Sequence, residues 1–211
     1  MAKTIGSKCK ICRAYGMKLF LKGERCNAEK CAFNKRPYPP GEHGKKRRKA
    51  SNFALQMYEK QKVKNMYGIL ERQFRRYFHL AARSNEITGR ALIESLERRL
   101  DNVVYRLCWA TSRSEARQMV RHGFILVNER KVDIPSYQIK QQDTIFLRQD
   151  KGEDIPDAVR AKYEQITQHR SVPAWLDSDI QQLRAEVKRF PQKEDLHLPI
   201  SEQMIVELYS K

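Results

Sequence analysis

The spacing of apolar residues changes at Gly123, and this change limits the folds that the middle of the chain can form. Before it, Ser112 followed by Glu115 is the capping-box pattern of a helix start, and apolar residues then recur at helical spacing. A glycine readily takes the left-handed conformation that ends a helix. After it come three short runs typical of strands, at 124–128, 131–134 and 144–148. We therefore expect a helix ending at His122 and a small antiparallel sheet, with a turn at Asn128-Glu129-Arg130.

Helical patterns also flank this region. We predict helices over 52–66, 69–83 and about 89–107, with Gly68 separating the first two. The third carries an apolar stripe that we assign to the core: Leu92, Leu96, Leu100, Val103, Val104 and Leu107. Toward the end of the chain, 156–169 favours a helix, 183–190 suits either a helix or a strand, and an apolar helix follows Ser201.

Four of the five cysteines lie together near the start, as Cys9-x2-Cys12, thirteen further residues, and Cys26-x4-Cys31. This spacing is close to that of four-thiolate zinc sites, in which two short knuckles each present two sulfurs. Residues 1–50 show little apolar periodicity, so we expect a metal to order this arm. Zn²⁺ is the favoured ion, and an iron–sulfur cluster on the same four cysteines is the alternative. Four protein ligands leave no open position, which indicates a structural role.

Positive charge is concentrated in the first two thirds of the chain. Lys and Arg outnumber Asp and Glu by 15 to 3 in residues 1–50 and by 18 to 11 in residues 51–150. In residues 151–211 there are 9 Lys and Arg against 11 Asp and Glu. Such a gradient is typical of a protein with a polyanionic partner, and nucleic acid is the leading candidate. The opening "MAKTIGSKCK" has no apolar core of a secretory signal, and no apolar run approaches 18 residues. We expect a cytoplasmic protein with no membrane partner.

The basic side chains gather in three places. Residues 45–49 read "KKRRK", the arginines of 69–83 lie off its apolar stripe, and those of the capped helix recur every fourth residue on one face. We predict that the residues that contact a nucleic acid are Lys45, Lys46, Arg47, Arg48, Lys49, Arg72, Arg76, Arg113, Arg117, Arg121, His122 and Lys131.

Asp101 raises an enzymatic alternative, because an Arg-Leu-Asp triplet also holds the catalytic aspartate of pseudouridine synthases. The residues after Asp101 depart from the pattern of those enzymes and lie in a helical stripe. We interpret Asp101 as a structural carboxylate, with Arg113 or Arg117 as the expected cation beside it. No catalytic motif or phosphate loop is recognised, so we expect neither an enzyme nor a small-molecule substrate. A zinc-dependent transcription regulator is the second alternative, and it would prefer duplex DNA.

One long stretch carries a family likeness: "LERRLDNVVYRLCWATSRSEARQMVRHGFILVNERKVDIPSYQIK". It closely resembles the signature of the bacterial small-subunit ribosomal protein four family, which gave the S-four RNA-binding domain its name. "PPGEHG", "EKQKVKNMYGILERQFRRYF" and the terminal "SEQMIVELYSK" resemble it too. The four cysteines are similar to those of the metal-binding branch of that family.

The resemblance implies an α+β fold: a helical domain holds, as an insertion, an RNA-binding domain of two helices on a small antiparallel sheet, beside the metal-stabilised N-terminal arm. We therefore expect a four-cysteine basic arm at 1–50, a helical rRNA-binding domain at 51–95 completed by about 176–211, and an S-four domain at 96–175.

The resemblance also implies a function. It implies a primary binder of the five-prime domain of 16S rRNA that nucleates small-subunit assembly. Its partners would be ribosomal protein five and other neighbouring small-subunit proteins, and mRNA near its entrance. Effects on translational accuracy are implied, as is, in some members, repression of translation of their own operon. The chain departs from the family at three turns. Cys108 and Glu129 replace glycines, and "KQQD" stands where the family has a Pro-Gly-Asp turn.

Overall fold

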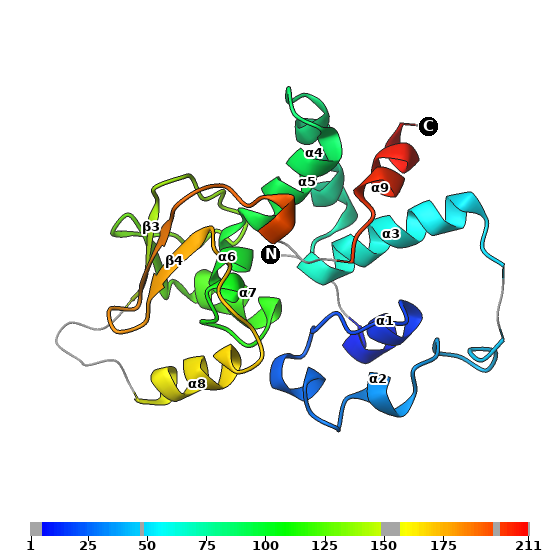
Figure 1. Ribbon diagram of the computed structural model, residues 1–211, viewed down its shortest axis with the longest axis horizontal. Helices are drawn as coiled ribbons and strands as arrows, with labels where there is room; N and C mark the ends of the chain where they lie inside the picture. The colour runs from blue at the N-terminus through cyan, green and yellow to red at the C-terminus, as the bar shows by residue number, and fades with distance from the viewer. Residues whose placement is uncertain (1–5, 47–48, 149–156, 196–198, 211) are drawn as a thin grey trace. The chain divides into compact units, whose positions relative to one another are not determined.

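The computed structural model describes residues 6–46, 49–148, 157–195 and 199–210, and the chain forms two compact units (Figure 1). The first unit consists of Met1–Ile93 with Leu198–Lys211, and the second of Glu94–His197. The chain therefore leaves the first unit, builds the second and returns. None of the described helices is long and apolar enough to cross a membrane.

The N-terminal part of the first unit is made of short elements: α1 (Lys8–Ala14), a 3₁₀ turn (Gly23–Cys26) and α2 (Ala32–Lys35). It rests on the next helix through two tyrosines. The rings of Tyr15 and Tyr58 meet edge to face with centroids 4.7 Å apart, and the Tyr58 hydroxyl donates to the Ala14 carbonyl at 3.0 Å. These contacts hold the N-terminal segment, which has little apolar periodicity of its own, against the longer helix α3.

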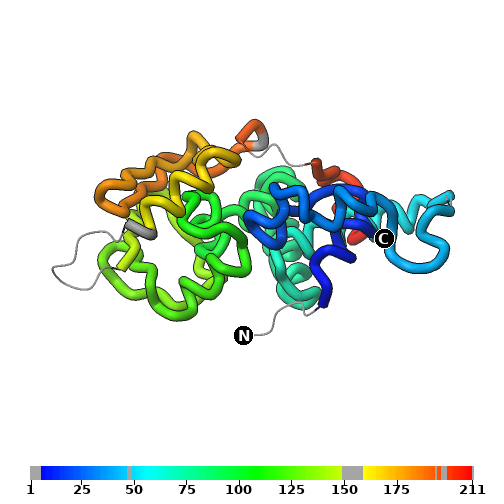
Figure 2. Tube along the Cα trace, turned by 90° about the horizontal axis from the view of Figure 1, so that it is seen from below, coloured from blue at the N-terminus to red at the C-terminus, as the bar shows by residue number. Residues whose placement is uncertain are grey.

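The helical part of the first unit contains α3 (Asn52–Tyr67), α4 (Glu71–Ala82), the start of α5 (Thr88–Glu97) and the C-terminal α9 (Glu202–Tyr209). Gly68 ends α3 in the left-handed conformation, with φ of 65°, as predicted. Tyr209 stacks on Phe78 with ring centroids 4.4 Å apart, which fastens α9 to α4. Figure 2 shows the C-terminal segment in red returning beside the helices of this unit.

The second unit packs helices on one antiparallel sheet. Its helices are α6 (Leu100–Arg106), α7 (Arg113–His122) and α8 (Asp157–Thr167). Its strands are β1 (Ile125–Val127), β2 (Arg130–Lys131), β3 (Thr144–Leu147), β4 (Leu176–Asp179) and β5 (Arg184–Val187), in the order β2-β1-β3-β5-β4. Val103, Val120, Ile125, Ile145 and Trp175 are fully buried between them. This arrangement confirms an α+β fold, the predicted capped helix and the strands predicted at 124–128 and 144–148. The strand predicted at 131–134 has the wrong bounds, because β2 covers only Arg130–Lys131 and so begins in the predicted turn.

The predicted single helix over 89–107 is wrong, because α5 and α6 are separate helices. Arg99 between them is extended, with φ of −64° and ψ of 134°, and forms a β-bridge with Gln138. The Leu100 N–H then donates to the Tyr137 carbonyl at 2.9 Å. The backbone at Tyr137 and Gln138, about 40 residues further along the chain, therefore forms the hydrogen bonds that a continuous helix would have made within itself.

The region 176–187 also differs from the expected division of the chain. We expected it to complete the helical domain, whereas it forms β4 and β5 of the sheet, with Ile145 opposite Ala185 and Leu176 opposite Val187. The segment that returns to the first unit begins later, at Leu198.

Candidate nucleic-acid interface

Helix α7 is held at both ends by the contacts that its sequence predicts. The Ser112 hydroxyl accepts from the Glu115 N–H at 3.3 Å, and Gly123 ends the helix with φ of 78°. The Glu115 carboxylate reaches back one residue further than expected and accepts from the Thr111 N–H at 2.7 Å. It also pairs with Lys162 of α8. Burial disfavours its charged form, but the hydrogen bonds from Lys162 and Thr111 outweigh this and lower the pKa of Glu115.

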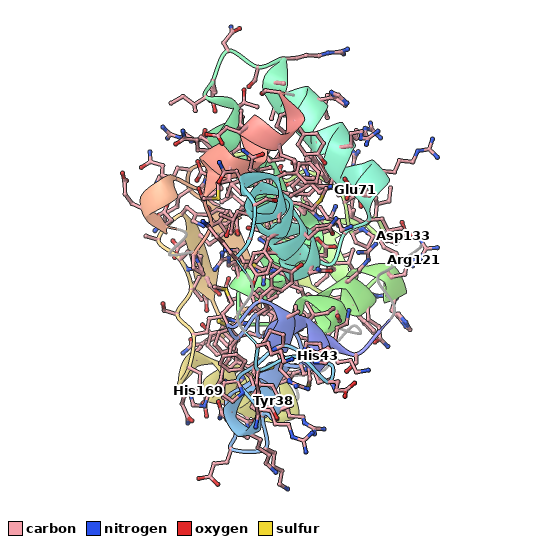
Figure 3. The ribbon with its side chains drawn as sticks, turned by 90° about the vertical axis from the view of Figure 1, so that its right-hand side faces the viewer. Tyr38, His43, Glu71, Arg121, Asp133 and His169 are labelled. Carbon is pink, nitrogen blue, oxygen red and sulfur yellow. The ribbon has the colours of Figure 1, made fainter. Side chains whose placement is uncertain are left out.

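The arginines on α7 differ in exposure. Arg113 is half-buried and its Nε donates to Asn102 Oδ1 at 2.8 Å, while Arg121 is exposed. Arg117, between them, is half-buried. Arg121 lies 3.9 Å from the exposed Asp133 carboxylate, and Figure 3 shows the two side by side. Exposed pairs at that distance contribute little, so Arg121 keeps its charge available to solvent.

Tyr105 lies between two guanidinium groups. Arg113 stands 4.3 Å and Arg170 3.7 Å from the centroid of its ring. Burial alone would raise the pKa of Tyr105, but these two cations together lower it. Arg113 is therefore tied to α6 as well as presented on α7. The sequence offered no signal for this contact, because Arg170 is far from Tyr105 along the chain.

At the end of α7, His122 is exposed and Lys131 lies across Gly123, where any Cβ would collide with it. The His122 imidazole stacks on Phe124, the residue before β1. The sequence pattern placed Phe124 in a strand, whereas it lies just before β1 with its ring against His122.

Helix α4 has the two faces that its sequence predicts. Phe74, Tyr77 and Phe78 are buried, and the predicted RNA-binding residues Arg72 and Arg76 are exposed. Burial of aromatic rings on one side thus leaves the cations on the other.

The basic run follows a turn that Arg13 organises. Arg13 Nε donates to the carbonyls of Arg36 and Tyr38, at 3.1 and 3.0 Å, and the Tyr38 ring faces Arg13 and Lys45, at 5.2 and 5.5 Å. Figure 3 shows Tyr38 and His43 in this turn. Of the run itself, Lys45, Lys46 and Lys49 are exposed, whereas Arg47 and Arg48 lie outside the described residues.

The four cysteines near the start are free thiols, three of them buried and Cys9 half-buried. Burial raises the pKa of Cys12, and the charges of Cys26, Cys9 and Cys31 raise it further. The Lys22 N–H donates to the Cys26 sulfur at 3.4 Å. Within the described part of the chain, no three His, Cys, Asp or Glu side chains form a group that could hold a metal ion.

Asp101 is structural, but its partner differs from the one expected. Arg99, not Arg113 or Arg117, pairs with it: Nε lies 3.0 Å from Oδ1 and the second nitrogen 2.6 Å from Oδ2. Both side chains are buried. The bend at Arg99 that splits the helix is what brings the guanidinium back onto the carboxylate.

A basic, capped helix on a small sheet, joined to a helical unit with an arginine face, is an arrangement suited to a protein that binds a polyanion such as a nucleic acid. Comparison with known families agrees. The ribosomal protein S4/S9 N-terminal domain family matches residues 3–97, and the S4 domain family matches residues 98–145. The chain belongs to the ribosomal protein S4 family.

Relatives support this over the full length. The chain is 54% identical to the small ribosomal subunit protein uS4 of Oleidesulfovibrio alaskensis and 53% identical to that of Nitratidesulfovibrio vulgaris, with all of both chains covered in each case. The uS4 protein of Dictyoglomus turgidum is 48% identical, again over all of both chains. This membership confirms a ribosomal protein rather than an enzyme.

Proposed function

We propose that this chain is a structural protein of the bacterial small ribosomal subunit, acting in the cytoplasm as a primary binder of 16S rRNA that nucleates subunit assembly. The observation that carries the proposal is identity of about half of all positions to uS4 proteins over the whole chain. The exposed cations of α4 and α7 support it, because phosphate contacts dominate the affinity of proteins for RNA.

The finer role follows from the same resemblance. We propose that the target is the five-prime domain of the rRNA, that ribosomal protein five is a neighbour, and that mRNA passes near the chain at its entrance to the subunit. Effects on decoding accuracy and translational repression of its own operon belong to this proposal. A folded RNA read through shape and phosphates suits exposed arginines on helices.

Footprinting of the purified chain on full-length small-subunit rRNA tests the function directly. We expect protection confined to the five-prime domain. Arg121→Gln should weaken binding and lower the slope of log affinity against log salt by about one, with little change in melting temperature. Arg160→Gln is the matched control, because Arg160 is an exposed arginine of α8 outside the predicted set. Preference for duplex DNA would favour a transcription regulator instead.

We also propose that Cys9, Cys12, Cys26 and Cys31 hold a structural Zn²⁺. The spacing of four soft thiol donors in one short segment and the lysines and arginines beside them in the sequence, which would offset thiolate charge, support it. Their side chains would have to converge, since they do not form a metal-holding group as they stand. Metal analysis of the pure protein should find about one zinc per chain. Stoichiometric iron with visible absorption would favour the cluster, and unchanged metal content in a Cys9→Ser, Cys26→Ser variant would refute the site.

A further inference from the structure

We infer that Phe124, stacked on His122, is a platform for an unpaired base of the bound RNA. This inference rests on the proposed function and adds to it one base contact, at a residue for which the sequence predicted no role. The two rings are nearly parallel, with an interplanar angle of 7° and centroids 6.2 Å apart. The side chain of Phe124 is 50% exposed and the imidazole beside it is exposed as well.

The backbone holds this pair in a fixed place. The Phe124 N–H donates to the Met119 carbonyl at 3.1 Å, and its own carbonyl accepts from the Arg148 N–H at 2.7 Å. Gly123, in the left-handed conformation, turns the chain from α7 into β1 between the two rings. An aromatic side chain has only two rotatable bonds, so a ring on a fixed backbone loses little conformational freedom when a flat ligand stacks on it.

Charge decides which ligand fits. The Lys131 side chain packs against Gly123, the residue that separates His122 from Phe124 in the sequence. The exposed Arg148, directly after β3, donates its N–H to the Phe124 carbonyl and so lies beside Phe124. The acidic residues nearby are Asp133, which lies beside Arg121, and the exposed Glu129. An aromatic face bordered by cations suits a nucleobase flanked by phosphates, since every base offers a π-face and aromatic stacking is the usual way to hold an unpaired one.

The test separates stacking from charge and from general apolar burial. The affinity of full-length small-subunit rRNA is measured for wild type, Phe124→Leu, Phe124→Trp and Ile134→Ala at several salt concentrations. Leu keeps an apolar side chain without a π-face, and Trp enlarges the face. Ile134, 52% exposed in the same unit, is the matched apolar control.

We expect Phe124→Leu to weaken binding by about 5- to 100-fold with an unchanged salt slope. Phe124→Trp should bind at least as tightly as wild type, and its new indole fluorescence should be quenched by the RNA. Chemical probing should show one base that becomes reactive only with the Leu variant. Ile134→Ala should bind as wild type does.

Equal binding by wild type and Phe124→Leu, or an equal loss with Ile134→Ala, would overturn the inference. If the Leu variant binds rRNA normally but fails to join the assembling subunit, the ring contacts a protein and the inference is wrong. These results differ from failure of the proposed function, in which wild type itself would give no rRNA footprint.

Discussion

At the scale of single residues, three positions where the chain departs from the resembled family have a backbone conformation that favours glycine. Cys108, Glu129 and Gln142 have φ of 61°, 64° and 66°. Cys108 and Glu129 replace glycines of the resembled family, and Gln142 lies in the "KQQD" turn that replaces Pro-Gly-Asp. The turns therefore keep left-handed geometry although the glycines are gone. A side chain with a Cβ costs about 1–2 kcal/mol in this region.

Replacing Glu129 by glycine should therefore stabilise the protein. We expect a gain of about 0.5–1 kcal/mol in the free energy of unfolding, since relief of strain exceeds the extra entropy of the unfolded chain. Urea unfolding measures it. Arg130→Gly, the exposed neighbour in β2, is the control and should lose stability instead. A loss for both variants would show that Glu129 is not strained.

Asp101→Asn should be strongly destabilising, because it removes a carboxylate from beside the fully buried Arg99 guanidinium. Loss of one partner of a buried pair costs roughly 3–5 kcal/mol. Asp133→Asn removes a carboxylate from an exposed pair and should change the free energy of unfolding by less than about 1 kcal/mol. Thermal and urea unfolding of both variants measures the difference. Similar small effects would show that the Arg99 pair contributes little.

At the scale of elements, α7 depends on its first cap. Ser112→Ala removes the hydroxyl that accepts from the Glu115 N–H, which should cost about 1 kcal/mol of unfolding free energy. Ser114→Ala, two residues further along the same helix and exposed, should be neutral or slightly stabilising. Because α7 presents the predicted RNA-binding arginines, the Ser112 variant should also bind rRNA more weakly. Equal stability of the two variants would rule out a role for the cap.

At the scale of the whole molecule, the C-terminal helix closes the first unit around Glu71. This carboxylate accepts from Lys60 at 2.7 Å, from Lys64 at 3.2 Å and from the Tyr209 hydroxyl at 3.0 Å. Burial opposes its charge, but the hydrogen bonds from Lys60, Lys64 and Tyr209 outweigh burial and lower the pKa of Glu71 below its ordinary 4.5.

A lowered carboxyl pKa stabilises the folded state above its unfolded value, and that contribution is lost as the pH falls through the folded pKa. We therefore expect Glu71→Gln to lower stability at pH 7 and to flatten the decline in stability below about pH 4.5. Urea unfolding between pH 3 and pH 7, monitored through the NMR resonances of the Tyr209 ring, measures this pH dependence of stability. Glu86→Gln is the control, because Glu86 is exposed and lies between α4 and α5. A pH dependence equal to wild type in the Glu71 variant would contradict this account.

Sequence patterns spanning a few residues determined by themselves where several helices begin and end and which of their faces are buried. The cap at Ser112, the stops at Gly68 and Gly123 and the aromatic stripe of α4 concern backbone groups and faces of one element, so the sequence states them directly. The same holds for the exposed arginines opposite the stripe and for the likeness to a ribosomal family.

Only the tertiary structure decided what depends on residues far apart along the chain. The bridge from Arg99 to Gln138 divides a pattern that reads as one helix, and Arg170 reaches Tyr105 from about 65 residues away. The placement of 176–187 in the sheet has the same origin, because a strand is defined by the partner that takes its hydrogen bonds. Such partners carry no local signal. The exposure of Phe124 belongs with them, since a solvent-facing ring and a buried one look alike until the neighbouring strands are in place.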